Sequence, residues 1–539
     1  MNELIDHRIR RSWAAEGSGS APLPAKALKW LRQRIGPVTP GVNVRPDSAL
    51  EVPPSRLEET VKQQLFDLVG TKYVLLDGSE RLARAGGLSY LDLLRRRLAE
   101  ELPVPDAVVL PADPDEVQAV VDACVRHDVG LVPFGGGTSV VGGVAALRGE
   151  KKAVIALDLA RLDTLVSVDP LSRIAVLRAG VRGPEAERLL GEHGFTLGHV
   201  PQSFERATIG GFAATRSAGQ ASSGYGRFED MVSGVRLATP RGEWRLGVAP
   251  ASAAGPDLRQ LAVGSEGALG VITEVALRVR PKPSASRYEG WVLDGWEAGS
   301  AAVRRLAQRH VLADVTRLSD VDETEVSLAL NSGWKTSALR GYLKARGVKQ
   351  PCLLIVGWED GSEAEVRARR RRTVAALRCA GALRIGRVLG DSWRRGRFSG
   401  PRQRDVLMDH GVCVETLETA AHWSKLSELR DVVRAALTAS LGPVIVMCHV
   451  SHAYETGASL YFTVLAARDD VDPIGQWRRA KAAASEAITG LGTISHHHAV
   501  GVDHAPYLAA EIGSLGVEVL RAAKAAVDPT GILNPGKLI

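Results

Sequence analysis

The side chains best suited to proton transfer lie near the C-terminus, in a Ser-His-His-His run that ends at His498. Only 13 histidines occur in 539 residues, so three in succession are a strong signal. Imidazole titrates near neutral pH, which makes His496, His497 and His498 candidates for general acid–base catalysis. If this piece of chain is extended, His496 and His498 share one side and His497 faces the other way.

The histidine run could instead hold a metal ion or form a purely structural cluster. A metal ion needs ligands beyond adjacent histidines, and the nearest candidates, His449 and His452, have no carboxylate partner close by in the sequence. A structural cluster needs no ligand at all. Because acid–base chemistry uses imidazole without further ligands, we favour that role and predict no metal site.

A glycine-rich segment, PFGGGTSVVGGV at residues 133–144, is suited to holding an anion. Consecutive glycines allow a sharp turn that brings several N–H groups against one ligand, and the hydroxyls that follow add donors. This predicts a pyrophosphate loop rather than a glycine-rich surface turn. The dinucleotide spacing G-x-G-x-x-G fails at Val140, and the segment has no P-loop lysine. The candidate cofactor-binding residues are Pro133, Phe134, Gly135, Gly136, Gly137, Thr138 and Ser139.

Two later segments, residues 201–243 and 262–283, carry the motifs T-x-G-G, T-R-S-A and G-S-E-G-x-L-G. In order and spacing, the three segments resemble the FAD-binding domain of the vanillyl-alcohol oxidase type of flavoprotein. No residue in them is identifiable as a flavin attachment site, so we expect non-covalent FAD. The resemblance implies that FAD also contacts Gln202, Ser203, Thr208, Gly210, Gly211, Thr215, Arg216, Ser217, Ala218, Glu266, Gly267, Gly270, Val271 and Ile272.

Three motifs in the C-terminal half, at residues 415–419, 448–464 and 493–498, are similar to those of the alkyldihydroxyacetonephosphate synthases. The resemblance implies that the acyl chain of acyl-dihydroxyacetone phosphate is exchanged for a long-chain alcohol, without net redox, to form an ether lipid precursor. It implies that Tyr461 and the three histidines are catalytic and that Arg404 binds the substrate phosphate. It also implies a homodimer and contact with a membrane surface.

Alternatives to these roles stay open. The chain departs from the eukaryotic pattern after the triplet, where Ala499-Val500-Gly501-Val502 lacks a lysine. An FAD-linked dehydrogenase or oxidase of a 2-hydroxy acid or alcohol would share the same cofactor domain, and a non-catalytic scaffold could retain FAD. Taken alone, Tyr461 could be a half-buried strand residue and Arg404 part of a surface ion pair.

Length and composition limit the number of domains, the compartment and the class of ligand. A chain of 539 residues predicts more than one domain, and 45% apolar residues suffice for large cores. No run of 18 apolar residues and no secretory h-region is present, and the five cysteines have no C-x-x-C spacing. These features favour the cytoplasm, and the lipid substrates that the resemblance implies add a peripheral contact at the inner face of the membrane. The net charge of +7 fits anionic ligands and is too small to indicate nucleic-acid binding.

The elements expected to position these residues form an α+β fold. Strands are expected at 107–110, 131–134, 153–159 and 174–180, with a helix capped by Asp113. Strands separated by long helices follow, and residues 393–404 are expected to form a loop. The C-terminus is expected to be one helix and a Pro/Gly tail. The predicted divisions are a helical region with a Pro/Ser/Gly-rich start (1–100), an FAD-binding domain (101–282), an antiparallel cap domain (283–480) and a segment completing the site (481–539).

Overall fold

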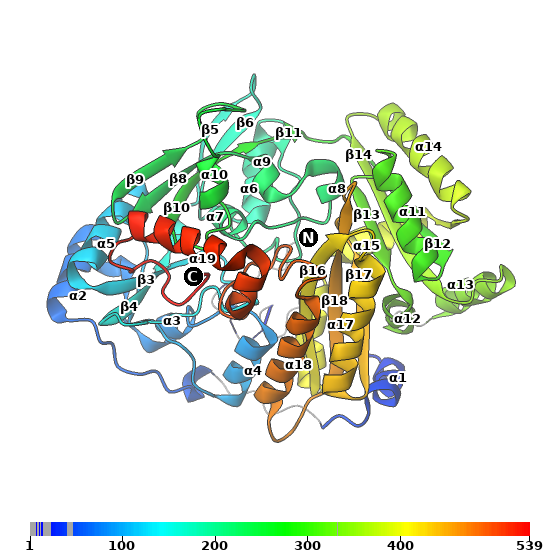
Figure 1. Ribbon diagram of the computed structural model, residues 1–539, viewed down its shortest axis with the longest axis horizontal. Helices are drawn as coiled ribbons and strands as arrows, with labels where there is room; N and C mark the ends of the chain where they lie inside the picture. Colours follow the sequence, from blue (N-terminus) through cyan, green and yellow to red (C-terminus); the bar gives the residue numbers. More distant parts are fainter. Residues whose placement is uncertain (1–6, 8–9, 11, 14–22, 40–46, 331–332) are drawn as a thin grey trace.

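The computed structural model describes residues 7, 10, 12–13, 23–39, 47–330 and 333–539 (Figure 1). Most of the Pro/Ser/Gly-rich start lies outside the described residues. The first helices are α1 (Ala25–Ile35), α2 (Glu59–Val69), α3 (Gly78–Leu82) and α4 (Tyr90–Leu98). The helix α4 begins with a capping box between Ser89 and Asp92 and contacts the strand β16 (Val412–His422), so the N-terminal region touches the later half of the chain.

The first sheet is mainly parallel. Its order is β1-β2-β4-β3, in which β1 alone pairs antiparallel. Its strands are β1 (Val74–Leu75), β2 (Ala107–Val109), β3 (Val129–Phe134) and β4 (Ala153–Asp158). Between β2 and β3 runs α5 (Pro114–His127), whose first N–H groups donate to the Asp113 side chain as predicted. All residues of β4 are buried, as expected for a strand covered on both faces.

The second sheet is antiparallel, with order β5-β6-β10-β8-β9. Its strands are β5 (Leu165–Asp169), β6 (Ile174–Arg178), β8 (Val232–Thr239), β9 (Gly242–Leu246) and β10 (Val271–Arg278). A separate ribbon pairs β7 (Phe195–Thr196) with β11 (Arg280–Pro281). The helices here are α6 (Gly183–Glu192), α7 (Ile209–Ala214), α8 (Ser222–Tyr225), α9 (Phe228–Met231) and α10 (Leu258–Ala262). Both sheets share one hydrophobic core.

The third sheet, here called the cap sheet, has seven strands in the order β15-β12-β14-β13-β17-β18-β16, paired antiparallel throughout. Its strands are β12 (Ala285–Asp294), β13 (Val315–Ser319), β14 (Pro351–Asp360), β15 (Leu383–Gly386), β16, β17 (Val444–Val450) and β18 (Gly457–Ala467). Its helices are α11 (Trp296–Gln308), α12 (Val321–Leu330), α13 (Trp334–Ala345), α14 (Glu363–Cys379), α15 (Arg387–Gly396), α16 (Gly400–Asp409), α17 (Leu426–Leu441) and α18 (Pro473–Ile488). The cap sheet lies beside the first two sheets (Figure 1).

Two expectations about local structure are wrong. Most of residues 393–404 belong to α15 and α16, and only 397–399 form a connection. The helix α15 packs on the cap sheet: Leu389 would lie 2.9 Å from a Cβ on Gly290, and Trp393 stacks on Tyr288. Tertiary packing here outweighs the local signals of glycine and proline. The C-terminal helix α19 (Leu508–Val527) is broken at Gly513, which has φ 76° and ψ 161°.

Candidate active site

A row of three chemically active side chains crosses the edge of the cap sheet. Tyr461 on β18 lies opposite Glu418 on β16 and opposite His449 on β17. Directly opposed residues of neighbouring strands point to the same face of a sheet, so the three side chains share one face. The rings of His449 and Tyr461 stack at a centroid distance of 4.9 Å. Strand register therefore brings together residues that lie more than 40 positions apart between β16 and β18.

Glu418 holds the histidine triplet in a turn. Its carboxylate accepts hydrogen bonds from the backbone N–H groups of His496 (2.7 Å), His497 (3.0 Å) and His498 (2.8 Å), and from the Ser495 hydroxyl (2.9 Å). Three successive N–H groups can converge on one carboxylate only if the chain bends. The expectation of an extended run with alternating sides is therefore wrong, and the reason is this buried acceptor.

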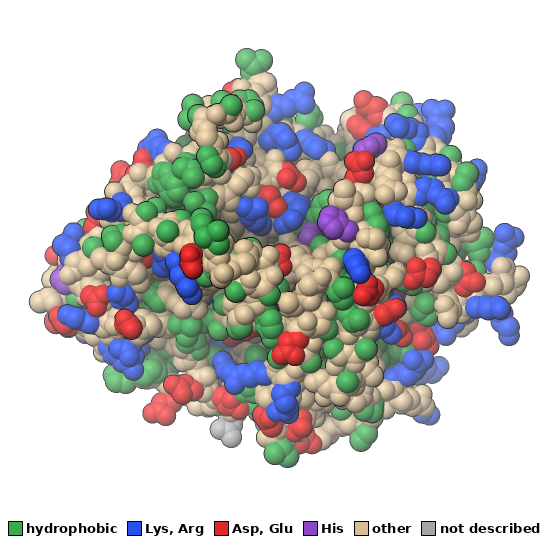
Figure 2. Space-filling view, in the orientation of Figure 1, with side chains coloured by type: hydrophobic (Ala, Val, Ile, Leu, Met, Phe, Trp, Pro, Cys, Tyr) green, Lys and Arg blue, Asp and Glu red, His purple; other side chains and the backbone are tan. Residues whose placement is uncertain are grey.

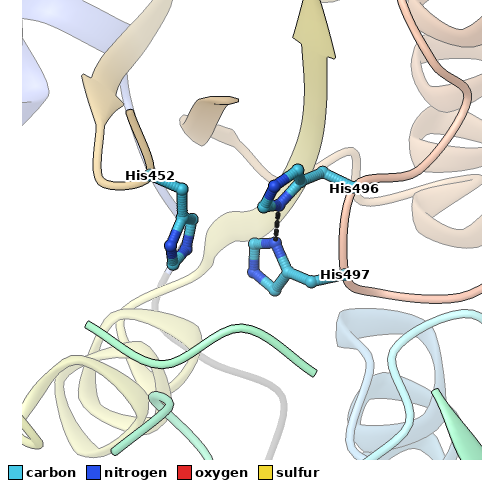
Figure 3. Close-up of side chains that lie close together, drawn as sticks. All are labelled: His452, His496 and His497. Atoms are coloured by element: carbon cyan, nitrogen blue, oxygen red, sulfur yellow. Dashed lines mark hydrogen bonds between the residues drawn. The ribbon is translucent and has the colours of Figure 1, made fainter. Parts of the chain in front are cut away.

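The imidazole rings gather as a consequence of that turn. His496 and His497 join through their Nδ1 atoms at 2.9 Å, and His452, from the segment after β17, stacks on His496 at 5.0 Å (Figure 3). The Tyr454 hydroxyl lies 2.6 Å from Nε2 of His496. His497 also lies 4.8 Å from the ring of His498. The result is one contiguous cluster of four imidazoles beside two phenols.

Burial fixes the protonation states of this cluster. It lowers the pKa of His496, His497 and His452 from the ordinary value and that of His498 to about 3. Burial acts to raise the pKa of Glu418, but the backbone N–H groups that donate to it outweigh burial and hold that pKa well below the usual range. The site at neutral pH thus combines one carboxylate with neutral imidazoles, which are able to accept protons.

Tyr461 complements these bases as a donor. Burial raises its pKa to about 12, so the phenol keeps its proton at neutral pH. The ring of His497 stacks on it at 6.0 Å and that of His498 meets it edge-on at 5.7 Å. The arrangement therefore places a proton donor next to neutral imidazoles that can accept protons.

Ring nitrogens of His452, His496 and His497 all lie within 4.8 Å of one another, a spacing that could also hold a metal ion. Nδ1 of His452, however, is bonded to the Ser222 hydroxyl, and both nitrogens of His496 are bonded to neighbours. Hydrogen bonding thus already occupies several ligand atoms. The absence of a metal stays a prediction.

Arg404 lies on α16 beside this cluster. Its side chain is buried, and Nη1 lies 3.6 Å from Oε1 of the buried Glu415, so Arg404 does not form a surface ion pair. Its charge is felt by Tyr461, where it opposes the effect of burial on the pKa. Nε of Arg404 is buried without a hydrogen-bond partner. An unpartnered N–H of a buried guanidinium beside the phenol is available to an anionic ligand.

The glycine-rich loop after β3 is shaped for close approach of the backbone. A Cβ on Gly135 would lie 2.4 Å from Oγ1 of Thr208, and one on Gly136 would lie 2.3 Å from the carbonyl oxygen of Arg206. Gly137 has φ 60°, and a Cβ there would lie 1.6 Å from the Arg10 guanidinium. Only glycine fits these positions. The loop and the T-x-G-G turn therefore form one cradle, as a pyrophosphate requires.

The G-S-E-G turn connects this cradle to the histidine turn. The Glu266 carboxyl accepts from the N–H groups of Val500 (2.8 Å) and Gly501 (2.9 Å), immediately after the histidines. Burial raises the pKa of Glu266 to about 7. Gly267 has φ 80° and would bring a Cβ within 2.8 Å of Pro133. Two predicted cofactor segments and the predicted acid–base residues thus meet at one place.

The other predicted cofactor residues line the same region in part. The Ser217 hydroxyl lies 3.0 Å from Nε2 of His199, and Gln202 accepts from Gln220. Arg216 donates instead to backbone carbonyls of Gln260 and Val263 and holds the G-S-E-G turn. Gly210 packs on Ala179. Buried polar atoms without a partner, as expected around a bound polar cofactor, are Nδ1 of His199, Oε1 of Gln220, Oγ of Ser223 and Oγ of Ser265.

Several site residues could not be assigned a role from the sequence. Arg10 reaches the glycine-rich loop from 126 positions away and donates to the carbonyls of Gly136 and Gly137. Glu418 lay within a motif, but its role as the common acceptor depends on strand pairing. Tyr454 and His452 likewise join the cluster only through the hairpin of β17 and β18. Recognising them requires the tertiary contacts.

A cleft of about 490 Å³ lies next to the cluster, between the ends of β16 and β18 and the start of α19. Tyr454, which bonds His496, lines it. The rest of the lining is mixed: Ala420, Ala421, Ala458, Leu491 and Ile494 are apolar, whereas His422, three threonines and Glu511 are polar. The volume suits a small-molecule ligand, and the apolar side chains offer contacts to the apolar part of such a ligand.

Cradle, imidazole cluster and cap sheet together define an FAD-dependent enzyme. Residues 105–246 match the family model of the FAD-binding domain, and residues 282–538 match that of the C-terminal domain of FAD-linked oxidases. The fold expected from the resemblance to vanillyl-alcohol oxidase is thereby confirmed, as is the cofactor FAD.

Similar proteins identify the enzyme family more closely. Alkyldihydroxyacetonephosphate synthase of Trypanosoma brucei brucei is 31% identical over 93% of this chain and 84% of its own length. That of Dictyostelium discoideum is 32% identical over 86% and 78%. A solved structure of an alkyldihydroxyacetonephosphate synthase superposes with a TM-score of 0.84 at 28% identity, covering 97% of this chain and 94% of that one. The chain belongs to the alkyldihydroxyacetonephosphate synthase family.

Proposed function

We propose that this enzyme exchanges the acyl chain of acyl-dihydroxyacetone phosphate for a long-chain alcohol, forming an ether and releasing a fatty acid. The observation that carries the proposal is the Glu418-held turn, which places neutral imidazoles beside the Tyr461 phenol and next to a cleft partly lined by apolar side chains. The exchange moves protons from and to carbon and oxygen atoms but transfers no net electrons. A cluster of bases and a donor matches that need.

Each group has a proposed task. FAD, when bound, supplies an electrophilic ring system. The glycine-rich loop would hold its pyrophosphate through backbone N–H groups, with the carbonyls of Gly136 and Gly137 fixed by Arg10. The neutral imidazole of His497 would accept a proton from the substrate, and Tyr461 would donate one. Arg404 would bind the phosphate with its free Nε–H, while its ion pair with Glu415 holds it in place.

The cleft would accommodate an alkyl chain. Because Tyr454 lines the cleft and bonds His496, a chain lying there would reach the border of the imidazole cluster. This supports long-chain acyl and alcohol substrates over small hydroxy acids, which would leave the cleft unfilled. Homodimer formation stays a prediction, to be checked by light scattering.

The competing activity is an FAD-linked dehydrogenase or oxidase, since the C-terminal family model is named for oxidases. Named relatives spanning most of the chain favour the synthase. The test is incubation of the FAD-loaded enzyme with palmitoyl-dihydroxyacetone phosphate and labelled hexadecanol. We expect an alkali-stable labelled lipid and no bleaching of the flavin by hydroxy acids under anaerobic conditions. Bleaching without ether formation would establish the oxidase instead.

Two variants link the activity to the cluster. His497→Ala and Tyr461→Phe should each lose ether formation while retaining FAD, because neither side chain closes the glycine-rich cradle. His193→Ala is a matched control, because this imidazole directly follows α6, is exposed to solvent and does not line the cleft. Full activity in either cluster variant would remove that residue from the mechanism.

A further inference from the structure

The helix α13 exposes aromatic side chains at the outer edge of the molecule, beyond the cap sheet (Figure 1). Trp334 is 78% exposed and Tyr342 is 45% exposed. Tryptophan is normally well buried, so an exposed pair on one short helix indicates a surface with a partner. Among the described residues, none of the helices combines the length and apolar character that crossing a bilayer requires, so any lipid contact must be made at a surface.

Helical geometry gives this element two apolar lines. Residues four apart lie above one another on an α-helix. Trp334, Ala338 and Tyr342 follow this spacing and are all exposed, whereas Leu339 and Leu343 follow it on another side, with Leu343 buried at 4% exposure. The leucines therefore attach the helix to the protein. The aromatic line is directed away from it.

Only positive charge flanks the aromatic line. Arg340 and Lys344, again four apart, are exposed. Two further exposed basic residues, Arg346 and Lys349, follow the end of the helix. Residues 333–350 contain no aspartate or glutamate. Within the part of the chain that the structure describes, no ion pair involves any of these four side chains. Figure 2 shows Lys and Arg side chains along the edge of the molecule where α13 lies.

The nearest acidic helix does not neutralise this charge. On α12, Asp322 pairs with Arg434 at 2.5 Å and Glu325 pairs with Arg34 at 2.9 Å. These carboxylates already have partners elsewhere on the protein. The basic side chains of α13 thus remain available to an external anion.

We propose that α13 docks the enzyme on an anionic lipid bilayer, with the Trp334 and Tyr342 rings among the headgroups and Arg340 and Lys344 on the lipid phosphates. Aromatic rings flanked by basic side chains are the composition of helices that lie in a membrane interface. A second copy of the chain fits less well, because a twofold contact through this helix would oppose like charges. The proposal rests on the proposed function only in that lipid substrates bring the enzyme to a membrane.

Vesicle flotation of the full-length, FAD-loaded enzyme tests this. We expect flotation with vesicles of equal parts phosphatidylcholine and phosphatidylglycerol, weakened by salt, and none with phosphatidylcholine alone. Arg340→Glu combined with Lys344→Glu should lower the partition coefficient at least about tenfold. Trp334→Ala combined with Tyr342→Ala should lower it while leaving the salt dependence in place.

The matched control reverses two exposed arginines on another helix of the same sheet, Arg371→Glu with Arg372→Glu on α14. This variant has the same net charge as the Arg340/Lys344 variant and should still float. Equal loss in both would overturn the proposal, because binding would then follow net charge alone. Absence of flotation with anionic vesicles would overturn the proposal outright. Loss of self-association in the aromatic variant, measured by light scattering, would also overturn it, because α13 would then contact a second copy of the chain.

Ether formation assayed in detergent separates this proposal from the proposed function. The α13 variants should keep activity on detergent-dispersed substrate and retain FAD. An enzyme that floats but forms no ether would refute only the proposed function. One that forms ether but does not float would refute only the docking role.

Discussion

Replacing Glu418 by glutamine tests whether one buried carboxylate sets the geometry of the histidine turn. The change keeps the side-chain volume and exchanges one oxygen for an NH2 group. If the remaining oxygen keeps the Oε1 position, it still accepts from Ser495, His497 and His498. The new NH2 group then faces the N–H of His496, which donates across only 2.7 Å in the parent enzyme. Two donors face one another, so this backbone group loses its acceptor.

The expected magnitude follows from these four bonds. A buried N–H without an acceptor costs about 1 to 3 kcal/mol, and each remaining bond falls from the strength of a bond to a charged group toward that of a neutral one. We therefore expect the unfolding free energy to fall by about 3 kcal/mol. Since the imidazoles would no longer be held in position, kcat should fall at least about tenfold. Urea unfolding and the ether-lipid assay measure the two effects.

A second glutamate on the same strand provides a matched control for Glu418→Gln. Glu415→Gln is equally buried, but Glu415 pairs with Arg404 and accepts from the backbone of Tyr90 and Thr416. It should raise KM for the phosphate-bearing substrate more than it lowers kcat. If Glu418→Gln retains FAD and a kcat within about twofold of the parent, the carboxylate does not control the turn and the reasoning fails.

Three further outcomes are expected. Arg404→Ala should raise KM by roughly tenfold to 150-fold, since a hydrogen bond to a charged group contributes about 1.5 to 3 kcal/mol; an unchanged KM would exclude the phosphate role. Acid precipitation should release all flavin into the supernatant, and a yellow pellet would show covalent attachment. Burial lowers the pKa of His199 and His498 to about 3, so only the unfolded chain binds these protons; their contribution to stability is complete above pH 6.5 and is lost as the pH falls toward 3. At pH 5.5 each histidine should lower the free energy of unfolding by about 1.4 kcal/mol. Urea unfolding at pH 7 and pH 5.5 measures this effect. The loss of stability between the two pH values should be smaller in His199→Gln than in the parent.

Local chemistry made some of the fold predictable. The α5 cap at Asp113 and the strands around it follow from short-range patterns, and the structure contains them at the expected positions. The helices α15 and α16 could not be predicted from short-range patterns, because glycine and proline weaken the local helical pattern of residues 393–404. Their stability comes from packing of α15 on β12 and of α16 on β16, contacts that a sequence window does not contain.

The candidate site, too, was predictable only in part. Its residue types were visible as a histidine run, a tyrosine in a strand pattern and a glycine-rich loop. Their arrangement was not, and the alternating geometry expected for the histidines was wrong because Glu418 gathers their N–H groups. Arg10 carried no pattern, and Tyr454 lay within the motif at residues 448–464 without a sign of its role.

By itself, then, the sequence determined which groups are present and where backbone must approach backbone, since the lack of a Cβ at Gly135 to Gly137 is a local steric property. Tertiary structure alone decided which groups meet and in which protonation state. Strand register placed Glu418 opposite Tyr461, and burial of the whole cluster lowered the pKa of its imidazoles. Register and desolvation depend on contacts between distant parts of the chain, so no local pattern specifies them.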